Sequence, residues 1–219
     1  MVTDDPGTRA DAERMYDLMQ SQRRSTQSRL LRGYAVLLVV WAAAWAIGFG
    51  ALWCGRDIGG VDLLPTPVAW IVFGVCMVAA IVWSIITGIR TGAGIRGRSR
   101  FQGMLYGWSW TISMVGTWLL LVGLQRAGLS DELAALLYPG AFALIVGVLY
   151  LAGGALWRAP VQYALGIVII VVAVAATFAG TPYNFLVYAI AGPIAMVIVA
   201  VLLVRGLLPV EPRREQSDE

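Results

Sequence analysis

The sequence contains no histidine and no lysine, and charged residues make up only 13% of its 219 residues. Without histidine, no imidazole can ligate haem or zinc and no histidine relay can move protons. The two cysteines, Cys54 and Cys76, lack the spacing of a redox or zinc motif. We interpret them as small apolar packing residues and expect neither a metal nor a cofactor.

Catalytic constellations are also missing, so we expect that the protein is not an enzyme. The long apolar runs contain no carboxylate, which disfavours proton-coupled transport through the low-dielectric interior. The segment Gly92–Gly97 satisfies G-x-G-x-x-G, but it follows an apolar run where a dinucleotide site would need a strand. We treat that match as accidental and expect no nucleic-acid partner.

What the sequence has in abundance is apolar residues, at 59% of the chain and with a mean hydropathy of +0.75. Six uncharged runs are each about 20 residues or longer, the length that a helix needs to cross about 30 Å of hydrocarbon. They are Tyr34 to Cys54, Val68 to Ile89, Met104 to Leu124, Leu133 to Trp157, Val161 to Gly180 and Phe185 to Val204. The prediction is an all-α, polytopic bundle of six transmembrane helices, spanning residues 33–205 and surrounded by lipid.

All 16 basic residues are arginine, a composition typical of GC-rich bacterial genomes. Their distribution predicts the orientation, because all but Arg56 and Arg126 fall in segments on one side of the predicted spans. The positive-inside rule then places both termini in the cytoplasm of a multi-pass protein of the bacterial cell membrane. Aromatic residues at the ends of the runs are interpreted first as membrane-interface residues: Tyr34, Trp53, Trp70, Tyr106, Trp157, Tyr163 and Tyr183.

The N-terminal segment, residues 1–32, is polar and is expected to be cytosolic, as is the tail at 206–219. A helix is predicted from near Thr8, with an apolar stripe that includes Met15 and Met19. Two interpretations stay open for this juxtamembrane amphipathic helix. It could dock a cytosolic partner, or it could lie on anionic headgroups.

Two helices carry stripes of small or weakly polar residues. Helix two has Cys76, Ala80, Ser84 and Gly88, and helix three has Ser109, Ser113 and Thr117. Such stripes allow close helix packing in lipid, or they could line a substrate path. Gly192 and Pro193 interrupt helix six, and interrupted helices often mark transporter sites. Ser84, Ser109, Ser113, Thr117, Gly192 and Pro193 are therefore the candidate path residues.

The loop between helices two and three contains Arg96, Arg98 and Arg100. These arginines could simply hold the loop inside, or together with Met15 and Met19 they could contact a partner. The candidate partners are a cytosolic ATP-binding subunit or a second copy of the chain. The two halves of the sequence also contain similar stretches, such as Gly50–Trp53 and Gly154–Trp157. They leave open an inverted repeat, in which the first three helices recur as the last three in the opposite orientation.

Three stretches, IGFGALW (Ile47 to Trp53), YGWSW (Tyr106 to Trp110) and VLYLAGGALW (Val148 to Trp157), carry a resemblance. They resemble uncharacterised six-helix integral membrane proteins of high-GC Gram-positive bacteria, which are often labelled transporter-like. The resemblance implies a transport-associated protein, either permease-like or an accessory subunit that relies on a partner for energy. The alternative is a membrane scaffold or envelope sensor that transports nothing.

Overall fold

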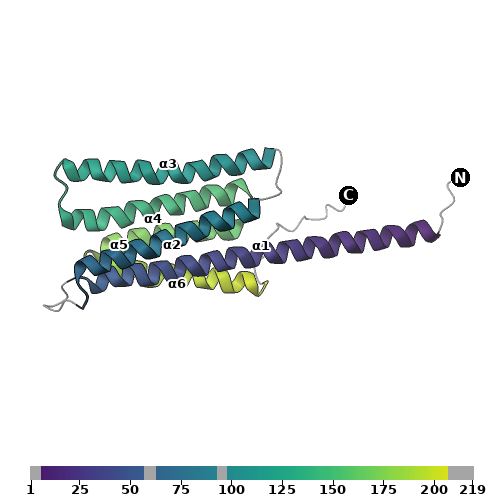
Figure 1. Cartoon of the computed structure of the whole chain (residues 1–219), viewed down its shortest axis with the longest axis horizontal. Helices are drawn as coiled ribbons and strands as arrows, with labels where there is room; N and C mark the ends of the chain where they lie inside the picture. Colours follow the sequence, from purple (N-terminus) through teal and green to yellow (C-terminus); the bar gives the residue numbers. More distant parts are fainter. Residues whose placement is uncertain (1–5, 57–62, 93–97, 207–219) are drawn as a thin grey trace.

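A computed structural model describes residues 6–56, 63–92 and 98–206 of the chain. These residues form six α-helices (Figure 1): α1 (Pro6–Cys54), α2 (Thr66–Gly92), α3 (Arg98–Arg126), α4 (Asp131–Leu156), α5 (Pro160–Ala179) and α6 (Tyr183–Val204). Each contains a stretch that is long and apolar enough to cross a membrane. The predicted all-α bundle of six transmembrane helices is therefore confirmed, and the protein is an integral, multi-pass membrane protein.

The helix α1 is a single element of 49 residues, about 73 Å long at 1.5 Å per residue. It begins at Pro6, because proline fits the first turn of a helix, where its missing N–H is not needed. The chain does not bend where the membrane-spanning part begins near Leu31, and the N-terminal half projects away from the bundle (Figure 1). A helix that lies along the headgroups would need a bend there, so that interpretation is not supported.

The six helices pack in the order α2, α1, α6, α5, α4, α3, as an arc that is open between α2 and α3 (Figure 1). The helices α2 and α3 follow each other in sequence, yet each packs mainly on one neighbour, α1 or α4. The membrane-spanning window of α1 is 44% buried, whereas those of α2 and α3 are 11% and 6% buried. The structure therefore has a core of α1, α4, α5 and α6 with two edge helices.

This arrangement bears on the inverted repeat that the sequence left open. Such a repeat would pair α1, α2 and α3 with α4, α5 and α6, so α2 would pack on α3 as α5 packs on α6. The pair α5 and α6 is in contact, but α2 and α3 do not pack together. The described helices therefore lack one of the symmetric contacts that a three-plus-three repeat predicts, although α1 packs on α2 as α4 packs on α5.

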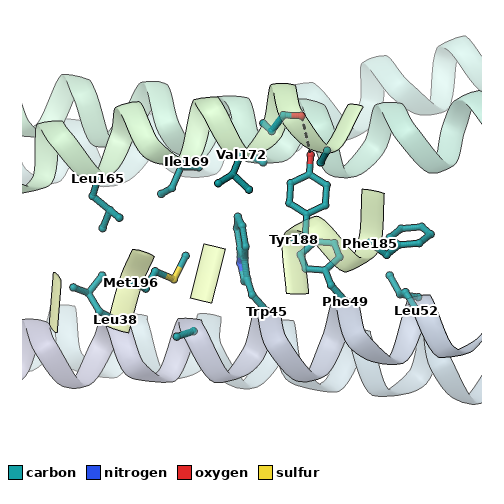
Figure 2. Packing of buried hydrophobic residues seen from close by; sticks show 14 of the residues in the cluster. Leu38, Trp45, Phe49, Leu52, Leu165, Ile169, Val172, Phe185, Tyr188 and Met196 are labelled. Atoms are coloured by element: carbon teal, nitrogen blue, oxygen red, sulfur yellow. Dashed lines mark hydrogen bonds between the residues drawn. The ribbon is translucent and has the colours of Figure 1, made fainter. Parts of the chain in front are cut away.

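The core is built on one face of α1, whose buried residues alternate three and four positions apart: Ala35, Leu38, Ala42, Trp45, Phe49 and Leu52. That spacing forms a straight seam along a helix. Figure 2 shows the seam facing α5 and α6. At its centre the Tyr188 ring stacks on Phe49 with centroids 4.9 Å apart, and Trp45 meets both rings edge-on.

Glycine allows the closest helix approaches. A side chain at Gly154 on α4 would place its Cβ atom 2.6 Å from the backbone nitrogen of Tyr163 on α5. One at Gly166 on α5 would place its Cβ atom 2.8 Å from the carbonyl oxygen of Gly147. Because backbone atoms cannot move aside as a side chain can, these positions accept only glycine. The helices α4 and α5 thus form a tightly joined pair.

Candidate functional site

A cluster of hydrogen-bonding side chains lies inside the bundle at the end where α1 enters the membrane. Its members are Tyr34 of α1, Tyr106 of α3, Tyr150 of α4 and Gln162 of α5, and we call them the tyrosine cluster. Tyr34 lies close to both Tyr106 and Tyr150. The cluster therefore joins helices that are far apart along the arc, and polar groups from four helices converge there.

Tyr106 attaches the edge helix α3 to the core. Its hydroxyl donates a 2.6 Å hydrogen bond to the carbonyl oxygen of Leu149. Its ring meets Trp157 edge-on at 4.6 Å between centroids. The hydroxyl also lies against Gly153, where an added Cβ atom would be 2.5 Å from both that oxygen and the Gln162 amide nitrogen. Gly153 therefore makes room for the cluster.

The hydroxyl of Tyr34 is buried, and it lies beside the hydroxyl of Tyr150 on α4. From the sequence we interpret Tyr34 and Tyr106 first as membrane-interface residues. Tyr34 lies near the end of its span, as that prediction requires, but its hydroxyl is buried in the bundle. Trp70, Trp157, Tyr163 and Tyr183 are exposed, as interface residues should be.

Exposed arginines surround this end of the bundle. Arg32 lies two residues before Tyr34 on α1, and Arg158 directly follows Trp157. Arg90 and Arg205 lie at the ends of α2 and α6, which finish at the same end of the molecule (Figure 1). The two carboxylates whose side chains are described, Asp131 and Glu132, lie in the first turn of α4 at the opposite end. The tyrosine cluster thus lies at an electropositive end.

A second polar contact explains the proline inside α4. Pro139 has no N–H to donate to the carbonyl of Ala135, four residues earlier. The side chain of Asn184 on α6 supplies the missing donor through a 2.9 Å bond from its Nδ2 atom to that carbonyl. Asn184 is the only buried polar residue among those described, at 1% exposure. It therefore connects the interrupted helix α4 to α6.

The predicted path residues lie in three separate places. Ser84 faces α1, where it accepts a 2.9 Å hydrogen bond from the Trp41 indole. Ala80 beside it is buried, so the stripe on α2 serves to pack α2 against α1. On α3, Ser109 is exposed, and its hydroxyl donates to its own helix at Leu105, while Ser113 and Thr117 are half-buried.

The interruption in α6 lies elsewhere again. Gly192 and Pro193 are buried in the core. A Cβ atom at Gly192 would lie 2.5 Å from the Trp45 ring, so this glycine lets α1 and α6 approach. Since α6 packs on α1 and α5, it meets neither Ser84 on α2 nor the stripe on α3 at close range. A single path through these six residues stays a prediction that the arrangement does not favour.

The predicted partner contacts are described only in part. Met15 is exposed on the projecting half of α1. Arg96 and the side chains of Met19, Arg98 and Arg100 lie outside the described residues. The outward face of α2 is apolar, with Gly74, Val75, Val78, Ala79, Val82, Trp83 and Ile86 along it. That face is available to lipid or to a second copy of the chain.

Sequence reasoning missed Tyr150, Gln162 and Asn184. A signal was present for two of them, because Asn184 is the only asparagine in the chain and Gln162 is a carboxamide inside a predicted run. Carboxamides are costly in lipid unless they find partners, so both should point inward. Comparisons with models of protein families, with curated proteins and with solved structures found no match to this chain.

Proposed function

We propose that this protein is transport-associated, as a permease-like or accessory subunit that relies on another chain for energy. The observation that carries the proposal is the position of α3, which closes over the tyrosine cluster while packing mainly on one neighbour, α4. An edge helix that covers polar groups at the bundle interior is suited to open and expose them. A solute could then reach hydroxyl and amide groups that are otherwise enclosed.

Two further features support a partner-dependent subunit. The projecting half of α1 is continuous with the helix that carries Tyr34, so a force applied outside the membrane reaches the cluster along one rigid element. Met15 and Tyr16 on that half are 67% and 63% exposed, which suits them to contact another chain. We place the protein in a bacterial cell membrane, with this half and both termini in the cytoplasm, on the basis of the arginine pattern.

Purification in a mild detergent tests the partner. Co-purification of an ATP-binding protein, lost in a Met15→Asp/Tyr16→Asp variant, would support the proposal. The matched control is Arg14→Glu, which changes charge on the same helix turn without removing an apolar contact. Isolation of the chain alone, together with no solute flux in liposomes with or without membrane extract, would contradict it.

The alternative function is an envelope scaffold or sensor, and the length of α1 favours it as a second candidate. A helix that runs from outside the membrane to the interior could report a bound partner without moving any solute. Flux assays separate the two functions. A sensor would bind its partner through the same α1 residues, but no solute would cross the membrane in its presence.

A further inference from the structure

The two edge helices are exposed to a similar extent, but they differ in composition. The span of α2 is 11% buried and that of α3 is 6% buried, and Figure 1 shows α3 at the end of the arc. Hydropathy separates them, because α2 is among the most apolar of the six spans and α3 is the least apolar. A helix that lipid surrounds on most sides should be strongly apolar, since polar groups find no partners in hydrocarbon. The composition of α2 therefore suits lipid, whereas that of α3 suits a contact with protein.

The uncovered side of α3 carries a regular row of residues, which we call the α3 seam. Its members alternate four and three positions apart, and all are exposed: Leu105, Ser109, Ile112, Gly116, Leu119 and Gly123. They are distinct from Tyr106 and Trp110, with which α3 contacts α4. This spacing is the pattern by which two helices pack along their whole length as a left-handed pair. The α3 seam therefore has the form of a helix contact.

Two glycines of the α3 seam have no packing role within the chain. A Cβ atom added at Gly116 or at Gly123 would meet no described atom within 4 Å. At Gly154 and Gly166, by contrast, glycine is what lets α4 and α5 approach. Glycine lowers the stability of a helix, and in membrane helices it is enriched where a second backbone comes close. The α3 seam thus has the small residues of a close contact, but no described helix of the same chain occupies it.

The α3 seam fits a second copy of itself. Copies of one chain have the same orientation in the membrane, so a twofold axis along the membrane normal brings equal positions of α3 together in a parallel pair. In such a pair each large side chain enters a hole formed by four residues of the facing helix. Ile112 then lies between Ser109 and Gly116 of the second copy. Leu119 likewise lies between Gly116 and Gly123 of that copy, so the large side chains meet small ones.

The polar groups of α3 also favour a second copy over an unlike partner. A twofold contact places each group against itself, which suits a hydroxyl because it both donates and accepts a hydrogen bond. Ser109 is the polar member of the α3 seam, and the charge of Arg126 comes only where the span ends. We infer that two copies of this chain associate in parallel through the α3 seam and leave the outward face of α2 to lipid. This association goes beyond the proposed function and does not depend on transport.

Energy transfer between copies of the full chain tests the inference. The copies carry a donor or an acceptor dye at the C-terminus, and the protein is diluted stepwise with lipid in liposomes. We expect the transfer to follow the dilution curve of a dimer. Gly116→Val adds bulk at the α3 seam and should raise the dissociation constant at least tenfold. Gly74→Val, the matched control on the outward face of α2, also enters open space and should change the constant less than twofold.

A second variant guards against a folding defect. Ile112→Ala shortens an exposed side chain without adding bulk, and it should raise the dissociation constant at least threefold. In micelles that hold fewer than one copy each, both α3 variants should unfold at the same midpoint as the native chain, because the copies are then apart. A native chain that shows only chance transfer at every dilution would overturn the inference. So would an unchanged constant in Ile112→Ala, or a larger loss from Gly74→Val than from Gly116→Val.

Discussion

The helix α4 contacts its two neighbours in different ways. On the α5 side, Gly154 and Gly147 bring backbone against backbone, with no space for an added methyl group. On the α3 side, contact depends on aromatic rings and on two side-chain hydrogen bonds, one from Tyr106 and one from Tyr138 near the other end of α3. Close backbone packing cannot be loosened gradually, whereas ring contacts and side-chain hydrogen bonds can be released and remade. The comparison indicates that α5 is a permanent neighbour of α4 and α3 a releasable one.

The largest loss of stability is expected when a side chain is added at the permanent contact between α4 and α5. Gly154→Val should lower the free energy of unfolding by about 3 kcal/mol, because its Cβ atom meets the backbone of Tyr163. Equilibrium unfolding in dodecyl sulfate mixed micelles measures the change. Gly116→Val on α3, where the structure leaves open space, is the control and should remain within about 0.5 kcal/mol of the native chain. Equal loss in both variants would remove the distinction between the two sides of α4.

A smaller loss of stability is expected when Asn184 is replaced, and its size should depend on whether Pro139 is present. Asn184→Leu leaves the Ala135 carbonyl without a donor, which should cost about 1 to 2 kcal/mol. In a Pro139→Ala background the restored N–H can bond that carbonyl within α4, so the same substitution should cost less. A double-mutant cycle measures this coupling. Strictly additive effects would show that Asn184 does not act through the freed carbonyl.

Removal of the Tyr106 hydroxyl should weaken the releasable contact without unfolding the core. We expect Tyr106→Phe to cost about 1 kcal/mol or less in global stability, since only one hydrogen bond is lost. Maleimide labelling of a cysteine at Gln162, with Cys54 and Cys76 replaced, should become faster because α3 opens more often. Tyr183→Phe, which removes the hydroxyl of an exposed tyrosine on α6, is the control and should be labelled as slowly as the parent protein. Labelling that is equally slow in all three proteins would argue against a mobile α3.

The smallest loss of stability is expected at α2, the other edge helix. Ser84→Ala removes the acceptor of the Trp41 indole and should cost about 0.6 kcal/mol, the typical value for a hydrogen bond between membrane helices. Ser109→Ala removes a hydroxyl that bonds only its own helix and should cost nothing measurable. The same unfolding titration compares the two. A larger loss from Ser109→Ala would mean that α3 has a second neighbour on that face.

Sequence reasoning predicted the six spans well because the hydrophobic length of a membrane helix is a local property. It predicted the packing use of Ser84 and Ala80 as one of two interpretations, since small residues at this spacing indicate close approach wherever the partner lies. It could not predict the tyrosine cluster, because Tyr34, Tyr106 and Tyr150 come from three helices. Tyrosines near helix ends are usually interface residues, and only the order of helices in the arc shows that these point inward.

The continuity of α1 was also beyond the sequence pattern. The polar segment before Arg32 and the apolar run after Gly33 differ in composition, so they suggest two elements with a boundary between them. The backbone has no glycine–proline pair or other strong breaker there, and the helix continues without interruption. Composition therefore marked where the membrane begins but gave no indication of whether the helix bends.

The central claim, that α3 is releasable from a permanent core, is tested most directly by distances between spin labels in lipid nanodiscs. One pair joins Gln102 on α3 to Arg205 after α6, and the other joins Ala164 on α5 to Arg205. We predict a broad or two-peaked distribution for the first pair, broader still in Tyr106→Phe, and a single narrow peak for the second. Equally narrow peaks for both pairs, unchanged by Tyr106→Phe, would contradict the account.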